Sequence, residues 1–318
     1  MTNPLYQPWL HRYACATPCV AMVTVIAGAL VTINNAGMAF RDWPTSDGHP
    51  MITYPWFSDF ATNWDRFLEH GHRLAGMLIG LWTIGLAVLL AVKEQRRWLK
   101  WTGGAILLAV ICQGILGGFR VWLDDRGLAM VHGMFAACVI AGMAAVATPL
   151  SARWRNAASI AGGRDAGAAK PVALLTVALL AAQYVLGGLI RHRGLGLYEH
   201  LTVGIVSLAL VIINAIVAHV TGIGWLKRTG WGLLAVVLLQ VSLGAGAWIT
   251  RYGLATFGYV AIADSIQQVV FRTVHTAFGM LVFATAVVHL VRVFRIDAFA
   301  PAMQPVLPAL TPAHGSST

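Results

Sequence analysis

Four histidines in this chain share one local pattern. Each stands near the start of an apolar run that follows a polar segment, and each has a glycine or alanine four residues later. Residues four apart lie on the same face of a helix, so each imidazole would have a small residue one turn deeper beside it. The four pairs are His72 and Gly76, His132 and Ala136, His200 and Gly204, and His275 and Gly279.

These four positions together favour ligands of a flat metal cofactor. A single membrane histidine is usually a hydrogen-bonded contact between helices, but four matched positions indicate a shared role. Imidazole is a frequent axial ligand of haem iron, and helix bundles form cofactor sites from side chains on facing helices. We therefore predict two metalloporphyrin sites, one between His72 and His132 and one between His200 and His275. Compact tetrahedral zinc sites, which usually add cysteine or carboxylate ligands, fit separated pairs less well.

A glutamate accompanies only one of the predicted pairs. Glu69 precedes His72 by three residues, so the two side chains share a helix face. Attraction to the helix macrodipole would explain Glu69 by itself, but beside an inward-facing ligand it is a candidate for chemistry at the haem edge. Glu199 is adjacent to His200 and points roughly 100° away. This difference predicts one reactive haem and one that carries electrons.

Arginines near the same ends of the apolar runs are candidates for contacts with haem propionates, because guanidinium binds carboxylate through two hydrogen bonds. Extension of these side chains to the membrane interface explains them equally well. They include Arg73, Arg120 and Arg272.

Three other histidines are expected to have no ligand role. His70 lies on nearly the opposite face of the helix from His72, and His219 and His289 are expected at the cytoplasmic edge of the membrane.

The elements that would position these residues are transmembrane helices. The 318-residue chain is 58% hydrophobic and 11% charged, with a mean hydropathy of +0.71, which excludes an ordinary soluble domain. About 20 apolar residues cross a bilayer core, and eight such stretches occur. They lie near 16–38, 70–92, 101–119, 128–149, 171–190, 198–220, 230–249 and 270–292.

The distribution of charge predicts the orientation of these spans. With eight spans both termini lie on one side, and the segments on that side hold 13 of the 22 basic residues and 3 of the 12 acidic ones. The positive-inside rule makes this side cytoplasmic, and the histidine pairs then lie toward the outer face. The net charge of +10 reflects topology and contact with anionic lipid, so no nucleic-acid partner is expected.

A repeated motif predicts internal duplication. Q-x-x-L-G occurs at 113–117, 183–187 and 240–244, near the outer ends of three odd-numbered spans. Together with the histidines, it predicts an all-α integral membrane protein whose eight helices form two pseudo-symmetric four-helix bundles. The expected parts are an amino-terminal half (1–150), a cytoplasmic linker (151–170), a carboxy-terminal half (171–297) and a disordered tail (298–318). An aromatic-rich outer loop is expected at about 39–69.

With these features together, the chain resembles the haem A synthase family. The segment Glu69-His-Gly-His72-Arg73 is similar to the family's E-x-x-H-R, and Ala36 to Gly48 is similar to its first outer loop. The Q-x-x-L-G and histidine positions also match, so the resemblance covers nearly the whole chain. Many family members carry a cysteine pair in the first outer loop, whereas residues 39–69 here contain no cysteine, which puts electron delivery by thiol exchange in doubt.

The resemblance implies an oxidoreductase that converts haem O to haem A by oxidising a ring methyl to a formyl group through a hydroxymethyl intermediate. It implies that His72 and His132 flank the substrate haem, that His200 and His275 ligate a resident haem b, and that Glu69 is the essential acidic residue. Haem O synthase and an electron donor are the implied partners. The absence of an arginine-rich transit peptide favours a bacterial plasma membrane.

Two other functions fit parts of the same pattern. A two-haem cytochrome b would need the four histidines but would have no use for Glu69. A transporter with an internal repeat would use the histidines as a proton relay and would bind no haem.

Overall fold

The computed structural model describes residues 7–162, 164 and 166–298, and within these residues the regular structure is helical apart from two isolated β-bridges. Eight helices of this part are long and apolar enough to cross a membrane, which confirms the all-α integral membrane fold. They are α1 (Pro8–Ile33), α3 (Trp64–Lys93), α4 (Arg97–Leu123), α5 (Arg126–Ala147), α8 (Ala169–Arg193), α9 (Leu197–Val220), α10 (Gly224–Tyr252) and α11 (Ile266–Asp297).

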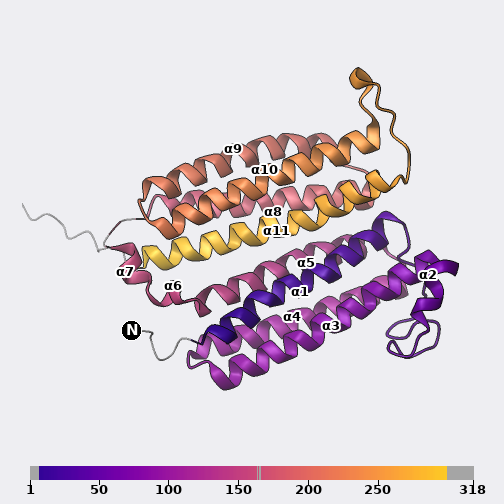
Figure 1. Cartoon of the computed structure of the whole chain (residues 1–318), viewed down its shortest axis with the longest axis horizontal. Helices are drawn as coiled ribbons and strands as arrows, with labels where there is room; N and C mark the ends of the chain where they lie inside the picture. The colour runs from indigo at the N-terminus through magenta and orange to yellow at the C-terminus, as the bar shows by residue number, and fades with distance from the viewer. Residues whose placement is uncertain (1–6, 163, 165, 299–318) are drawn as a thin grey trace, which may run out of the picture.

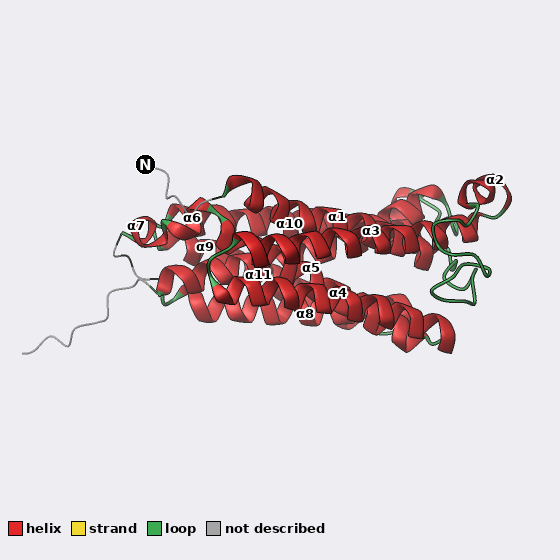
Figure 2. Ribbon diagram, turned by 90° about the horizontal axis from the view of Figure 1, so that it is seen from below, coloured by secondary structure: helices red, strands yellow, loops and turns green. Residues whose placement is uncertain are grey.

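The long helices lie along one common axis (Figures 1 and 2), and their contacts divide them into two groups of four. In the first group α1, α3, α4 and α5 contact one another in a closed cycle, and α8, α9, α10 and α11 do the same in the second. The groups meet where α11 packs against α1 and α5, and where α5 packs against α8. One buried cluster continues from the interior of the first group, with Leu86, Leu90 and Leu99, to α5 and α11, with Met143, Met280 and Ala284.

The first long helix begins and ends earlier than the sequence predicts. Pro8 at its start suits the first helical turn, where no backbone N–H needs a partner. Its end is a Schellman motif: Asn35 takes a positive φ of 55°, and the N–H of Ala36 donates to Val31 O at 2.9 Å. The predicted span 16–38 is therefore wrong at both ends, because hydropathy does not register these end signals.

The second long helix also begins earlier than expected. Asn63 caps it by accepting a hydrogen bond from the Arg66 N–H at 3.2 Å, so Trp64 to Glu69 are helical rather than part of the outer loop. The loop before it holds the short helices η1 (Trp56–Ser58) and α2 (Asp59–Thr62). Glu69 consequently stands in the second turn of a helix, where its direction is fixed.

The first described residues, the segment between the groups and the end of α11 lie at one end of the bundle (Figure 1); we call this the basic end. The segment contains η2 (Thr148–Leu150), α6 (Ala152–Arg155) and α7 (Ala157–Ala161), and its buried alanines pack against α10 and α11. Its described residues are thus a packed part of the fold. Apart from Ala298, the predicted tail 298–318 lies outside the described residues.

The opposite end carries the outer loop with α2 and the connection between α10 and α11, which includes η3 (Ala255–Phe257) (Figure 1). We call it the histidine end, because the four matched histidines lie in the half of each helix nearest to it.

Candidate functional site

The structure brings the four histidines together as two separate pairs. The ring centroids of His72 and His132 are 6.4 Å apart, and those of His200 and His275 are 6.3 Å apart. Two imidazoles that bind one metal ion from opposite sides, with bonds of about 2 Å, have ring centres roughly 6 Å apart. Both pairs therefore have the separation that two axial ligands of one iron require.

The repeated Q-x-x-L-G motif holds the histidine of the following helix. In each copy the glutamine Nε2 donates to the backbone carbonyl of that histidine: Gln113 to His132 at 2.9 Å, Gln183 to His200 at 2.9 Å and Gln240 to His275 at 3.0 Å. The glycine of each copy faces the same imidazole. A Cβ at Gly117, Gly187 or Gly244 would lie 3.1, 3.4 or 2.9 Å from the imidazole Cε1. The motif thus fixes the backbone of the histidine and leaves room for its ring.

Helix α1 contacts the ring of His72 although it lacks the Q-x-x-L-G motif. The Thr24 carbonyl lies 3.0 Å from His72 Nδ1, and a Cβ at Gly28 would lie 2.7 Å from the His72 Cε1. Thr24 and Gly28 have the same four-residue spacing as the glutamine and glycine of the motif. Sequence reasoning missed both residues, although this T-x-x-x-G spacing in the first odd-numbered span was an available signal.

The carbonyl contacts also determine which imidazole nitrogen is free. Nδ1 of His72 faces Thr24 O, and Nδ1 of His275 faces Gln240 O at 3.2 Å. Because a carbonyl oxygen can only accept, these bonds place the proton on Nδ1. Nε2 then keeps its lone pair, which is the arrangement found in metal-binding histidines.

The small residues one turn after the histidines differ between the two groups. No side chain lies within 4 Å of a Cβ built at Gly76 or at Gly80, so the space predicted beside His72 is present. The corresponding space at Gly204 is taken by the Gln183 amide, 3.1 Å away, and at Gly279 by that of Gln240, 3.2 Å away. In the second group these glycines make room for the bracing glutamines.

Glu69 is buried at 3% exposure and is fully engaged. Its Oε1 forms an ion pair with Arg73 Nη2 at 2.7 Å, and its Oε2 accepts from the Phe40 N–H at 3.1 Å. Arg73 Nη1 also donates to the carbonyls of Asp42 and Thr45, at 2.8 and 2.7 Å. The E-x-x-H-R segment therefore ties α3 to the outer loop, and a buried charge pair with added hydrogen bonds is the arrangement in which such charges are tolerated.

The other arginine candidates have different surroundings. Arg120 Nη1 donates to the carbonyl of Gly37, so it too holds the outer loop. Arg272 is half-buried on α11, three residues before His275. Arg191 of α8 reaches across to α1 and donates to Ala29 O at 3.1 Å, next to the glycine that faces His72.

The three histidines expected to have no ligand role occupy separate environments. His70 is fully buried beneath the outer loop, with Nδ1 3.0 Å from Ser46 Oγ and its ring against Tyr54. His219 accepts from Trp231 Nε1 at 3.1 Å. His289 is 1% exposed, and its Nδ1 lies 2.9 Å from Thr229 Oγ1. Its expected place at the cytoplasmic edge of the membrane stays a prediction.

One aromatic residue lies between the two pairs. Tyr184 follows the glutamine that braces His200, and its hydroxyl donates to Gly133 O at 3.4 Å, next to His132. Its ring also lies 3.8 Å from a Cβ built at Gly279, one turn after His275. Tyr184 thus contacts the surroundings of both pairs.

Fold and site together define a multi-pass α-helical membrane protein with two paired-histidine sites and a buried Glu–Arg ion pair beside one of them. A family model described as a cytochrome oxidase assembly protein (COX15-CtaA) matches residues 61–202, which include Glu69, His72, His132 and His200. Proteins named heme A synthase match as well.

The heme A synthase of Bacillus cereus (strain 03BB102) is 30% identical over 135 residues, which is 41% of this chain and 40% of that protein. That of Geobacillus kaustophilus (strain HTA426) is 30% identical over 155 residues, 48% of this chain and 46% of that protein. These matches confirm the predicted resemblance to the haem A synthase family, over less than half the length of either relative. No solved structure shows significant similarity to the chain.

Proposed function

We propose that this protein is a haem A synthase, an integral membrane oxidoreductase that converts the ring methyl of haem O to a formyl group through a hydroxymethyl intermediate. The observation that carries the proposal is the arrangement of two equivalent histidine pairs of which only one has a buried glutamate in its E-x-x-H-R segment. The similarity to proteins named heme A synthase supports it.

In this proposal the pair His72 and His132 holds the substrate haem O, and the pair His200 and His275 holds a resident haem b. The spacing of the rings in both pairs, together with the free Nε2 of His72 and of His275, fits axial ligation of one iron in each pair. Nε2 of His132 and of His200 lies within 3.2 and 3.4 Å of the amide of Gln113 and Gln183, which would have to turn away when iron binds. When bound, the resident haem supplies one-electron transfer. The open space beside Gly76 and Gly80, absent beside Gly204 and Gly279, supports placing the exchangeable porphyrin in the first group.

Glu69 is the proposed catalytic residue. Its ion pair with Arg73 and its bond from the Phe40 N–H fix the direction of the carboxylate on the face of α3 that carries His72. A fixed negative group in a site shielded from water stabilises positive charge that develops on a nearby carbon far better than it would in water. Glu69 would therefore favour oxidation of a ring methyl held beside it.

Arg120 and Arg272, together with Arg73, are proposed to contact the propionates of the two haems. The two groups of helices are proposed to be pseudo-symmetric halves, 1–150 and 171–297, in a bacterial plasma membrane with both termini cytoplasmic and the haem sites toward the outer face. Haem O synthase would supply the substrate. Dioxygen would be the oxidant, taking two electrons from the methyl group and two from a separate donor in each hydroxylation and releasing water.

The test is to co-express the chain with a haem O synthase and extract the haems from membranes under aerobic conditions. We expect haem A from the wild-type protein and its loss in Glu69→Gln, with haem b still bound. The matched control is Glu199→Gln, which alters the exposed glutamate beside His200 and should keep haem A formation.

Two results would contradict the proposal. A haem b spectrum with only haem O or haem b extractable from the wild-type protein would indicate an electron-transfer cytochrome. Absence of any Soret band from protein purified under the same conditions would favour a transporter.

A further inference from the structure

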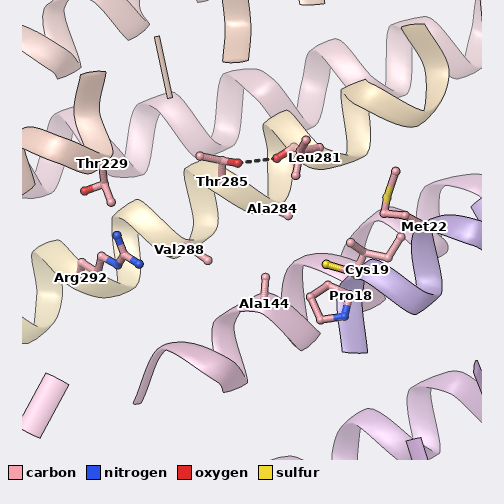
Figure 3. A pocket seen from close by; sticks show the side chains of 11 residues that line it. Pro18, Cys19, Met22, Ala144, Thr229, Leu281, Ala284, Thr285, Val288 and Arg292 are labelled. Atoms are coloured by element: carbon pink, nitrogen blue, oxygen red, sulfur yellow. Dashed lines mark hydrogen bonds between the residues drawn. The ribbon is translucent and has the colours of Figure 1, made fainter. Parts of the chain in front are cut away.

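A cavity of about 260 Å³ lies between the two groups of helices (Figure 3), and none of the paired histidines lines it. One wall comes from α1 and α5 and the other from α10 and α11; we call this cavity the leaflet slot. Most of its lining is apolar and includes Met22, Ile140 and Leu281. Thr285 is a polar residue near its middle on α11, and Thr229 and Arg292 lie toward the basic end. It extends along α11 from Leu281 to Arg292.

The length of the leaflet slot matches one leaflet of a bilayer. Eleven residues of helix separate Leu281 from Arg292, a rise of about 16 Å, and the hydrocarbon core of a bilayer is about 30 Å thick. Pockets that enclose drug-sized ligands measure roughly 300–1,000 Å³, so this smaller volume suits a single chain better than a ring system. On α11, His275 is six residues before Leu281, about 9 Å from the near end of the slot, and 17 residues before Arg292, about 25 Å from its far end.

Arg292 lacks a negative partner within the part of the chain that the structure describes. Its Nε is buried without a hydrogen-bond partner, and no ion pair with a carboxylate is formed there. Trp225 covers the guanidinium at 5.3 Å, and Arg153 is near enough to repel it. A guanidinium that is partly buried in the protein is costly unless a partner balances its charge.

We propose that the leaflet slot binds an anionic phospholipid, with one acyl chain between the two groups of helices and the phosphate paired with Arg292. Guanidinium binds phosphate through two parallel hydrogen bonds, and basic pockets between transmembrane helices on the cytoplasmic side are known to suit anionic head groups. A neutral quinone would fill the apolar part but would leave the charge of Arg292 unbalanced. The bound lipid would hold α1 and α5 against α11.

The test uses the full chain in nanodiscs of mixed phosphatidylcholine and phosphatidylglycerol, followed by native mass spectrometry of the released protein. We expect retention of one phosphatidylglycerol in preference to phosphatidylcholine. Arg292→Gln should reduce this preference about fivefold, the contribution of one basic residue at an anionic surface. Arg228→Gln removes an exposed charge near the same end of the bundle and should leave the preference unchanged.

A second variant covers the case in which Arg292→Gln disturbs folding. Ala284→Leu places a larger side chain in the slot while Arg292 is intact, and it should reduce retention of phosphatidylglycerol in protein that elutes as a single species on gel filtration. Equal retention of both lipids, or a preference that neither variant reduces, would overturn the proposal. Displacement of phosphatidylglycerol by a quinone in quinone-doped nanodiscs would overturn it as well.

Discussion

An imidazole can ligate a metal reproducibly only if its ring and backbone are held in place. Here the holding groups come from the preceding odd-numbered helix, as a glutamine to the histidine carbonyl and a glycine against the ring. The sequence predicted the histidines and the recurrence of Q-x-x-L-G, but not that the two patterns touch. A contact between a side chain and a distant backbone carbonyl leaves no trace in the histidine segment itself, and for the same reason Thr24 was missed.

The glycine of the motif gives a prediction at this scale. In Gly244→Ala the new Cβ would lie 2.9 Å from the Cε1 of His275, closer than normal packing allows, so the imidazole must move. We expect the ratio of haem b to protein to fall, measured from the Soret absorbance and haem extraction.

The control for this prediction is Gly232→Ala on the same helix, where a Cβ meets nothing within 4 Å. Replacing glycine with alanine in a helix interior stabilises by up to about 1 kcal/mol, so this variant should keep its haem and melt no lower than wild type. Full haem b content in Gly244→Ala would show that the ring is not confined by the motif.

The buried ion pair gives a second prediction. Arg73→Met leaves the carboxylate of Glu69 buried without its partner, with both side chains less than about one-tenth exposed in the wild-type protein. Loss of one partner from a buried pair typically costs about 3–5 kcal/mol. We expect a lower free energy of unfolding in denaturant titrations, with part of the loss recovered in the double variant Glu69→Gln, Arg73→Met. A stability equal to wild type would mean that water reaches Glu69.

At the scale of elements, the apolar runs predicted all eight long helices, but several of their ends were misplaced. The ends depend on Pro8, on the positive φ of Asn35 and on the cap at Asn63, which act over single residues and do not alter hydropathy. The outer loop was predicted as an aromatic cap, whereas its link to Glu69 and Arg73 could be seen only in the structure. The loop therefore positions the proposed catalytic residue.

Asp42 gives a prediction for this loop. Burial raises the pKa of its carboxyl, but hydrogen bonds from Thr45 and from the N–H groups of Gly48 and Asp47 outweigh that effect and lower the pKa to about 2. Because the folded value lies below the usual value of about 3.9, ionised Asp42 stabilises the loop above about pH 4, and this stabilisation is lost as the pH falls through about 2.

Hydrogen exchange of the loop amides checks this expectation, after correction for the intrinsic pH dependence of exchange. Wild-type protein should keep protection at Asp47 and Gly48 down to about pH 3, and Asp42→Asn should lose much of it already at neutral pH. Equal protection in the two proteins at pH 7 would show that the carboxylate does not hold the turn.

For the whole molecule, the sequence predicted two sets of four spans and their histidines. The structure shows three features that the sequence could not predict, because each depends on how the two groups meet: the packing of α7 against α11, the contact of Tyr184 with the surroundings of both pairs, and the leaflet slot. Residues far apart in sequence, such as Met22 and Leu281, become neighbours only through this packing. The proposed division between the two histidine pairs, one holding a substrate haem and the other a resident haem, belongs to this scale.

The most direct test of that division is the haem composition of His132→Ala and His275→Ala, purified after co-expression with a haem O synthase. The account predicts that His275→Ala loses haem b and keeps haem O unoxidised, whereas His132→Ala keeps haem b and lacks haem O and haem A. Loss of the same haem from both variants, or wild-type levels of haem A in either, would contradict it.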